Sequence, residues 1–375
     1  MYHIGFIIEQ ALGHITHGKT LQQNLAHDPS IASYWGLPRQ DVGGLLGKVG
    51  NWTVKAGMQS RRAIRQMRHD AARADAQIDA LFFHTQVTAV LAQDWMSRIP
   101  SVISLDATPL QYDSLGKFYN HEAGGGRSEQ VKFWLNQRCY QQAKHIVTWS
   151  QWAKDGLIGE YGISAEKITV IPPGVNPTDW KRPQERTLDS DKRVKILFVG
   201  GNLDRKGGKL LLEASQRLLQ RGFAIELHLA TRDTVAEQAH IHVYNNMQPN
   251  SPELRALYHE CDIFCLPTYG DCLPMVLSEA AAAGMPSVST NVAAIPEIVQ
   301  HQETGWIVPT GDVDALEAAL QQLVEQPNRR LDMGRQAQAR LSQTFDAEKN
   351  ARRLLSLLKR VADQSVNTEH LAYSN

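Results

Sequence analysis

The chain has 375 residues, of which 42% are hydrophobic and 21% are charged, as is usual for a soluble globular protein. Its length suggests two domains, each with a hydrophobic core of its own. Lysine plus arginine and aspartate plus glutamate both number 39, so the charge balance does not indicate a nucleic-acid partner. No apolar segment approaches the ~20 residues that a membrane-spanning helix needs.

The four cysteines, Cys139, Cys261, Cys265 and Cys272, lack the paired spacing of a zinc site. Two of them lie in or beside a predicted buried strand, which favours reduced and buried thiols. Together with the lack of a secretory signal, reduced thiols predict a cytoplasmic protein.

The first half of the chain alternates apolar runs with helical segments, as expected for a parallel sheet covered by helices. Its predicted strands are residues 4–8, 80–84, 102–106 and 145–149. One predicted helix ends at about residue 26, and the others span residues 87–96, 131–143 and 151–161. The polar segment 111–126, which ends in a glycine run, is predicted to be a mobile loop.

Residues 42–69 form a basic segment that contains no aspartate or glutamate. Its cations are Lys48, Lys55, Arg61, Arg62, Arg65 and Arg68, with Trp52, Val54, Met58, Ile64 and Met67 between them. A basic amphipathic helix with an aromatic flank is typical of a protein that rests on an anionic membrane surface. A solvated helix face with core contacts explains the pattern equally well.

Polar residues follow several predicted strands of the first half. His84 and Asp106 lie at strand ends, where each could meet a ligand or stabilise a turn. His14 and His17 lie at the start of the first helix, and a polar helix start is a better interpretation of them than a metal site. The segment after the first strand has no G-x-G-x-x-G motif, which argues against a dinucleotide-dependent dehydrogenase.

Proline and glycine in residues 172–174 indicate the end of the first domain. We predict an N-terminal domain at residues 1–175, a linker at 176–192, a second domain at 193–345 and a C-terminal helical segment at 346–375. Strands of the second domain are predicted at residues 194–199, 226–230, 241–244, 263–266 and 306–308, with a short strand from Val288. One of its helices is predicted to end at about residue 221, and the others are predicted to span residues 252–260, 275–283 and 313–341.

One segment of the second domain carries two acids in a strand–loop–helix pattern. Pro267 stops the strand, and Pro274 suits the first turn of the helix that follows. Asp271 lies in the loop, and Glu279 follows eight positions later (279 − 271), about two turns into the helix. Loops of this kind lie at the carboxyl edge of a parallel sheet, where α/β folds place their ligands.

The start of this helix suits an anionic group such as a diphosphate, because its first N–H groups lack intrahelical partners. The two acids cannot bind phosphate, since like charges repel, but they can accept hydrogen bonds from neutral hydroxyls on either side of it. A ligand with a central diphosphate and hydroxyls at both ends is a nucleotide sugar.

Arg205 and Lys206 lie on a glycine-bearing loop that precedes another predicted helix. A cation pair in this position is suited to hold a diphosphate. A surface turn that happens to be charged is the alternative.

The acid-bearing segment, Pro267-Thr268-x-x-Asp271-x7-Glu279-Ala280, resembles the E-x7-E signature of retaining GT-B glycosyltransferases, specifically family 4, group 1. Asp271 stands where the family usually has glutamate. Lys206-Gly207 resembles the phosphate clamp of the family. In this chain Gly201 occupies the position where the family has an arginine, and Arg205 would supply the second cation instead. The resemblance extends over nearly the whole chain, from Ile4 to about Gln364.

Two parts of the first half add to this resemblance. Gly13 and His17 resemble the N-terminal Gly-Gly-x-x-x-His loop, which faces the donor phosphates and the acceptor in the family. Asp106 aligns with a histidine that many members carry. Residues 167–176 resemble the family's I-x-N-G-V-D segment at the end of the first domain.

The resemblance implies two Rossmann-like, doubly wound parallel-sheet domains that face each other across a cleft, with a C-terminal helix at residues 346–375 that crosses back to the N-terminal domain. It implies retaining, metal-independent transfer of a hexose-type sugar from a UDP-, GDP- or ADP-sugar to a polysaccharide, glycolipid or small glycoside, with no cofactor. Same-face attack, in which the leaving phosphate takes the acceptor proton, requires no protein base.

The resemblance also assigns roles to particular residues. Lys206, Arg205 and the helix start at Leu273, Pro274 and Met275 would stabilise the leaving diphosphate. Glu279 would hold the ribose hydroxyls, and Asp271 would hold hydroxyls of the transferred sugar. The first domain would contribute Gly13, Asp106 and His17.

Three alternatives remain on the sequence alone. The first is a GT-B nucleotide-sugar epimerase or phosphorylase. The second is a catalytically weak sugar-nucleotide binder, suggested by the departures at Gly201 and Asp271. The third is a membrane-docking scaffold that uses residues 42–69, which leaves the two acids unexplained. The base and sugar of the donor and the acceptor stay open.

Overall fold

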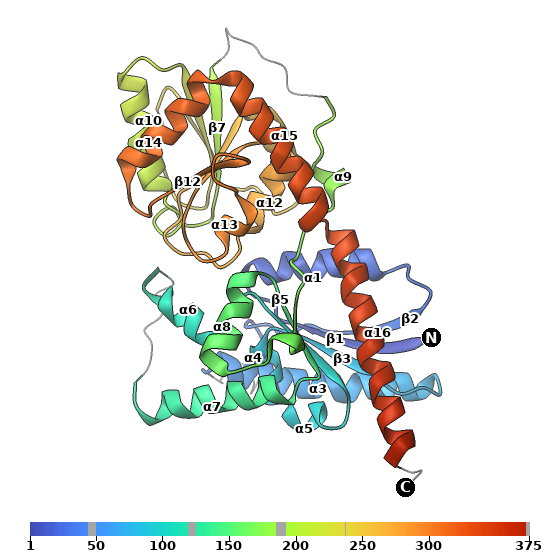
Figure 1. The fold of residues 1–375 in the computed structure, drawn as a ribbon. Helices are drawn as coiled ribbons and strands as arrows, with labels where there is room; N and C mark the ends of the chain where they lie inside the picture. Colours follow the sequence, from blue (N-terminus) through green and yellow to red (C-terminus); the bar gives the residue numbers. More distant parts are fainter. Residues whose placement is uncertain (44–49, 119–124, 185–192, 237, 373–375) are drawn as a thin grey trace. The chain divides into compact units, whose positions relative to one another are not determined.

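The computed structural model describes residues 1–43, 50–118, 125–184, 193–236 and 238–372. They form two compact units (Figure 1). Unit 1 takes the described residues within 1–112, 122–172 and 347–375, and unit 2 takes those within 113–121 and 173–346. Each unit contains one six-stranded sheet in which all pairings are parallel. The predicted fold class, α/β with two parallel sheets, is confirmed.

The sheet of unit 1 has the strand order β2-β1-β3-β4-β5-β6. Its strands are β1 (Tyr2–Ile8), β2 (Ile31–Gly36), β3 (Ala80–His84), β4 (Ser101–Leu105), β5 (His145–Thr148) and β6 (Ile168–Val170). Every residue of β3 and β4 is buried, because helices cover both faces of the sheet.

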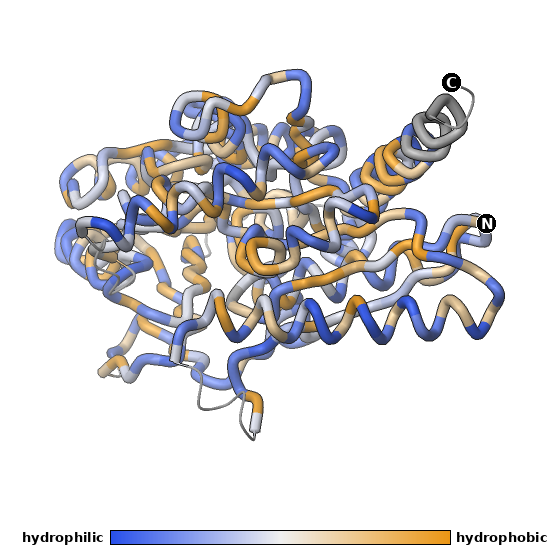
Figure 2. The backbone as a smooth tube through the Cα atoms, turned by 90° about the horizontal axis from the view of Figure 1, so that it is seen from below, coloured by the Kyte–Doolittle hydropathy of each residue, from blue (hydrophilic) through white to orange (hydrophobic). Residues whose placement is uncertain are grey.

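Two hydrophobic clusters fill the two faces of this sheet. Leu21 of α1 (Leu12–Leu25) and Leu358 of α16 (Ala347–Ala372) pack with Phe6 and Phe82 on one face. Figure 2 shows hydrophobic and hydrophilic residues alternating along the helix that leads to the C-terminus, as expected for a helix with one buried side.

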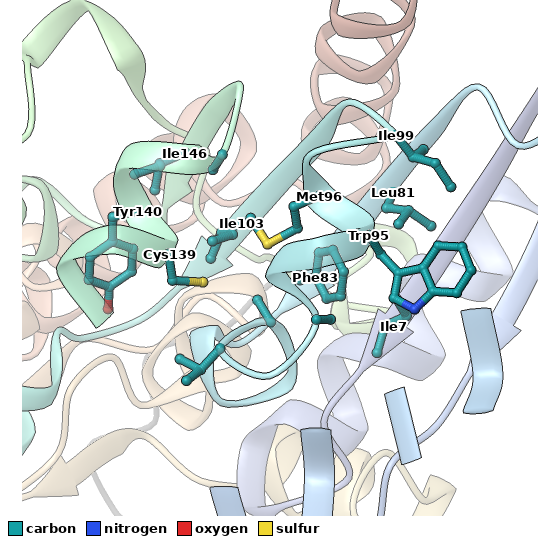
Figure 3. Packing of buried hydrophobic residues seen from close by; sticks show 14 of the residues in the cluster. Ile7, Leu81, Phe83, Trp95, Met96, Ile99, Ile103, Cys139, Tyr140 and Ile146 are labelled. Carbon is teal, nitrogen blue, oxygen red and sulfur yellow. The ribbon is translucent and has the colours of Figure 1, made fainter. Parts of the chain in front are cut away.

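Within the described residues, five more helices belong to unit 1. They are α3 (Trp52–Arg73), α4 (Gln86–Ala89), α5 (Gln93–Met96), α7 (Arg127–Gln142) and α8 (Gln151–Tyr161), and the short 3-10 helix η2 (Ala165–Lys167) precedes β6. On their side of the sheet, Trp95 and Met96 of α5 and Cys139 and Tyr140 of α7 pack in one cluster with Phe83 (Figure 3).

The sheet of unit 2 has the strand order β12-β11-β10-β7-β8-β9. Its strands are β7 (Val194–Val199), β8 (Ile225–Ala230), β9 (Ile241–Tyr244), β10 (Ile263–Leu266), β11 (Ser287–Thr290) and β12 (Gly305–Val308). Its helices are α9 (Pro177–Trp180), α10 (Gly208–Gln220), α11 (Pro252–Glu260), α12 (Met275–Ala282), α13 (Ile295–Ile298), α14 (Val313–Glu325) and α15 (Pro327–Thr344). Helices α10 and α14 lie side by side, and α12 contacts α15 (Figure 1).

Two predicted elements of the first half are wrong. The helix predicted at residues 87–96 is split into α4 and α5, and between them the Gln93 side-chain amide donates to the Val90 carbonyl at 3.0 Å. The loop predicted at 111–126 overlaps α6 (Pro109–Ser114) and the 3-10 helix η1 (Gly116–Phe118), and residues 119–124 lie outside the described part. The Thr108 hydroxyl accepts a hydrogen bond from the Gln111 N–H at 3.1 Å at the start of α6.

Strand β2 has no counterpart in the prediction. It is an edge strand whose four central residues are half-exposed, so it lacks the continuous apolar run of a central strand. Within the predicted linker, residues 177–180 form α9, and Trp180 packs edge-on against Tyr258 with ring centroids 5.1 Å apart. Residues 185–192 of that linker, and Lys48 of the basic segment, lie outside the described part.

Among the described residues, no helix combines the length and the apolar character that crossing a membrane requires.

Candidate functional site

Two loops at the carboxyl edge of the sheet in unit 2 are tied together by their backbones. The loop after β7 carries Arg205, whose carbonyl accepts hydrogen bonds from the Tyr269 N–H at 2.9 Å and the Thr268 hydroxyl at 3.1 Å. Gly207, in the same loop, has a φ of +75°, and a Cβ there would lie 1.9 Å from the Pro267 carbonyl oxygen. Only glycine permits this approach, so the resemblance at Lys206-Gly207 has a structural reason.

The joined loops bring one carboxylate and two cations into contact. The Lys206 ammonium donates to both oxygens of Asp271, at 2.7 and 2.6 Å. The Arg205 guanidinium donates to Asp271 Oδ1 at 3.1 Å, and the Thr268 hydroxyl donates to Oδ2 at 3.0 Å. The three charged side chains are 10% to 18% exposed, so their interaction is only weakly screened by water.

This arrangement uses the whole hydrogen-bonding capacity of Asp271. An ionised carboxylate offers about four lone-pair sites, and Lys206, Arg205 and Thr268 together make four bonds to it. Arg205 also donates to the Gly270 carbonyl at 2.5 Å. An anion that approached the loops would compete with Asp271 for both cations.

Glu279 lies in a different environment, on the buried side of α12. The Tyr258 hydroxyl of α11 donates to Glu279 Oε2 at 2.9 Å, and both side chains are buried. Burial raises the pKa of Glu279 to about 7, although the hydrogen bond from Tyr258 and the charge of Arg255 act in the opposite direction. Glu279 lies in the predicted helix, but only about one turn after its first residue, Met275 (279 − 275 = 4 residues), and not two turns as predicted.

The remaining donor-side positions lie around these loops. Helix α12 begins at Met275 with Pro274 in the N-cap position, and Leu273 is buried just before it. Gly201 is exposed, and a Cβ on it would lie 3.6 Å from Arg232 Nε. Arg232 comes from the loop after β8 and stands beside the position where the resemblance places an arginine. Its proximity depends on the pairing of β7 with β8, so local sequence could not indicate it.

In unit 1, aromatic and imidazole rings gather at the carboxyl edge of the sheet. His84, at the end of β3, stacks on Trp149, which follows β5, with centroids 4.9 Å apart. His14 Nδ1 lies 2.8 Å from His84 Nε2, and the His17 ring contacts both His84 and Trp149. Burial lowers the pKa of His17 to about 3 and that of His84 well below its usual value, so both rings are neutral at pH 7.

This ring cluster supports the first turn of α1. His84 and Trp149 are buried, and the rings of His14 and His17 pack against them. Gly13 is exposed, with open space where a Cβ would lie. Sequence reasoning missed Trp149, although its place after a strand was a usable signal.

A buried acid, Glu9, also lies at this edge of the sheet in unit 1. Glu9, which follows β1, accepts hydrogen bonds from the Thr85 hydroxyl at 2.6 Å and the Trp52 indole at 2.5 Å. Asp106 directly follows β4 and is half-buried. Parallel strands end at one edge, so the fold gathers these residues at the place where α/β proteins bind ligands.

Comparison with known proteins finds two family profiles in the chain. Residues 21–179 match "Glycosyltransferase Family 4", and residues 193–326 match "Glycosyl transferases group 1". The chain is 29% identical over 241 residues to the amylovoran biosynthesis glycosyltransferase AmsK of Erwinia amylovora, a match that covers 60% of this chain and 58% of AmsK. The chain spans about half the length of the curated relatives it matches.

Solved structures share the fold. Sucrose-phosphate synthase from Thermosynechococcus elongatus superposes with a TM-score of 0.73 at 14% identity, covering 96% of this chain and 99% of that one. Anabaena HepE in complex with UDP-glucose superposes with a TM-score of 0.66 at 16% identity, covering 96% and 100%. The two six-stranded parallel sheets therefore have a GT-B-like arrangement of elements.

Glu279 predicts a pH dependence of stability with a defined sign. Its pKa rises from 4.5 to about 7 on folding, so the folded state binds the proton more tightly, and stability falls as pH rises between these values. When the pH rises from about 5 to about 8, the parent should lose about 2–3 kcal/mol of unfolding free energy relative to Glu279→Gln, which has no carboxylate to ionise at this position. Urea denaturation at both pH values measures this difference.

The exposed Glu325→Gln variant is the matched control, since it removes one carboxylate from the surface of the same unit. An offset between parent and Glu279→Gln that stays constant with pH would contradict the raised pKa.

Proposed function

The chain belongs to group 1 of glycosyltransferase family 4, and we propose that it moves a hexose-type sugar from a nucleoside-diphosphate sugar to an acceptor hydroxyl, with retention at the anomeric carbon. The observation that carries this proposal is the contact of Lys206 and Arg205 with Asp271 at the carboxyl edge of unit 2. Cations and an acid in contact can serve a ligand that has phosphates next to hydroxyls.

Donor binding would exchange the partners of these three side chains. The diphosphate would draw Lys206 and Arg205 onto its own oxygens, because phosphate carries more charge than a single carboxylate. Asp271 would then have lone pairs available for hydroxyls of the transferred sugar. Phosphate binding and sugar orientation are thereby coupled through one carboxylate.

The reaction itself would be a substitution at the anomeric carbon. The bond from this carbon to the phosphate oxygen breaks, the bond to the acceptor oxygen forms on the same face, and the acceptor proton moves to the leaving phosphate. Lys206 and Arg205 would stabilise the negative charge that grows on the diphosphate, with the helix start at Leu273, Pro274 and Met275. These cations would supply the charge stabilisation that a divalent metal supplies in other transferases, so we propose that transfer needs no added metal.

The other residues would position the two substrates. Glu279 would hold the ribose hydroxyls of the donor, and Arg232 would supply the cation that is lacking at Gly201. In unit 1, the open first turn of α1 at Gly13 and the half-buried Asp106 would face a saccharide or lipid-linked acceptor, with His17 beside them.

The names of similar proteins suggest which substrates to test first. HepE was solved with UDP-glucose, so UDP-sugars come before GDP- and ADP-sugars. AmsK is named for amylovoran biosynthesis, which favours a saccharide acceptor.

Removal of the Lys206 ammonium tests the proposed role most simply. Lys206→Ala should lower kcat for sugar transfer by about 10²–10³-fold, because a preorganised charge next to the leaving group is lost. Lys209→Ala is the matched control. Lys209 lies three positions after Lys206 in the sequence, and it pairs with Asp204 on the exposed surface. Transfer and donor hydrolysis are measured for both variants with and without acceptor, after a thermal-shift panel of UDP, GDP and ADP has selected the donor.

Equal activity of Lys206→Ala and the parent would contradict the proposal. Epimerised donor without transfer, or phosphorolysis, would identify a GT-B enzyme of another reaction. Tight nucleotide binding without turnover on any acceptor would identify a catalytically weak binder.

A membrane-facing acceptor side is favoured by one surface of α3. Val54 and Met58 are 39% and 46% exposed, and the exposed Arg62 and Arg65 continue the same side of the helix. Several other cations of residues 42–69 are engaged within the unit: Lys55 bonds the Gln40 carbonyl, Arg61 pairs with Asp94 and Arg68 stacks on Trp95. Within the described part of residues 42–69, the proposed anionic-lipid surface is therefore the stripe of Val54, Met58, Arg62 and Arg65.

Vesicles test this surface. The parent should co-sediment with vesicles rich in anionic phospholipid at low salt, and Arg62→Ser/Arg65→Ser should bind at least about tenfold more weakly, since each basic residue contributes about 1 kcal/mol. Arg335→Ser/Arg352→Ser, two exposed arginines elsewhere, changes the net charge equally. No sedimentation of the parent, or equal loss in both double variants, would contradict a local lipid surface.

A further inference from the structure

Two strands of unit 2 place three metal-ligating side chains on one face of the sheet, outside the loops described above. Glu226 and His228 are two positions apart on β8, so both side chains point to the same face. His242 on β9 is the register partner of His228. One ligand atom from each residue lies within 4.8 Å of the other two.

His228 is oriented by a hydrogen bond on one side of its ring. Its Nδ1 lies 2.9 Å from the Tyr244 hydroxyl, and the residue is only 4% exposed. Its Nε2 has no hydrogen-bond partner among the residues that the structure describes and lies 3.8 Å from Glu226 Oε2. With Nδ1 as the hydrogen-bond donor, a buried nitrogen lone pair faces a carboxylate oxygen, an arrangement that a cation between them would satisfy.

We propose that Glu226, His228 and His242 form a binding site for a divalent transition-metal ion of the Zn²⁺ class. Two imidazoles and one carboxylate are a common Zn²⁺ ligand set, with water in the fourth position. The Tyr244 hydroxyl takes the part of the outer partner that holds a ligating imidazole in one orientation.

The site is adjustable where an ion would need it to be. Bonds of about 2.0–2.2 Å place tetrahedral ligand atoms closer to one another than the 4.8 Å limit seen here. His228 is fixed, but His242 is exposed and the Glu226 side chain is 26% exposed, so both can rotate toward a common centre. The imidazole rings of His228 and His242 already lie next to each other in a stacked arrangement, with their centroids 4.8 Å apart.

Two cations limit the affinity of this site. Arg193 Nε lies 4.0 Å from Glu226 Oε1, and Lys195 is the register partner of Glu226 on β7. Arg193 approaches Oε1, whereas Oε2 faces His228, so the carboxylate can serve both. We therefore expect micromolar binding that ties the half-exposed edge strand β9 to β8, independent of the metal-free transfer proposed for the donor loops.

Metal binding to the full chain tests the site. Chelator-treated protein is dialysed against Zn²⁺, and Co²⁺ replaces Zn²⁺ to report tetrahedral coordination in its visible spectrum. The parent should take up one equivalent at micromolar concentrations, and Zn²⁺ should raise its unfolding temperature. His242→Gln and Glu226→Gln should each weaken uptake by at least about tenfold and abolish the temperature shift, because each removes one of three ligands.

His27→Gln, which removes an exposed histidine from unit 1, is the matched control and should bind like the parent. His242 is exposed, so its variant should fold, and circular dichroism checks this. Absence of stoichiometric uptake by the parent at micromolar Zn²⁺, or uptake that is unchanged in both His242→Gln and Glu226→Gln, would overturn the site. Sugar transfer by the parent in the presence of chelator reports on the donor loops separately.

Discussion

The contact of Asp271 with Lys206 and Arg205 is the interaction around which the proposed donor site is built. The contact forms because the two loops that carry these residues lie close together. They approach so closely that a side chain at position 207 would collide with the Pro267 backbone, and glycine there permits the approach. Hydrogen bonds to the Arg205 carbonyl then fix the register of the two loops. In this setting one carboxylate contacts two cations, which leaves a net charge of +1 that water screens only weakly, and a ligand of higher negative charge can take the place of the carboxylate.

The same fold principle organises both units. Parallel strands end at one edge, so residues from distant parts of the sequence meet there. In unit 2 the edge carries the charged loops, and in unit 1 it carries a buried stack of His84 and Trp149 behind the first turn of α1. His14 and His17 in and after this turn contact the buried rings, while Gly13 leaves the turn open.

Local sequence predicted what depends on local pattern. The central strands, the helix that carries Glu279 and the cation pair next to Gly207 all follow from apolar runs, glycine and proline. Contacts that depend on strand pairing were out of reach. Arg232 lies beside Gly201 because β7 pairs with β8, and His228 meets His242 because β8 pairs with β9. Glu279 was predicted as a donor-site residue, but its partner Tyr258 comes from another helix, so its raised pKa was not foreseeable.

A crystal structure of the protein with a bound nucleoside-diphosphate sugar would show the proposed exchange of partners. In it, we expect the Lys206 ammonium to lie within hydrogen-bonding distance of a phosphate oxygen and Asp271 to accept hydrogen bonds from hydroxyls of the transferred sugar. A donor bound elsewhere, with Lys206 still donating to both oxygens of Asp271, would contradict the proposed exchange.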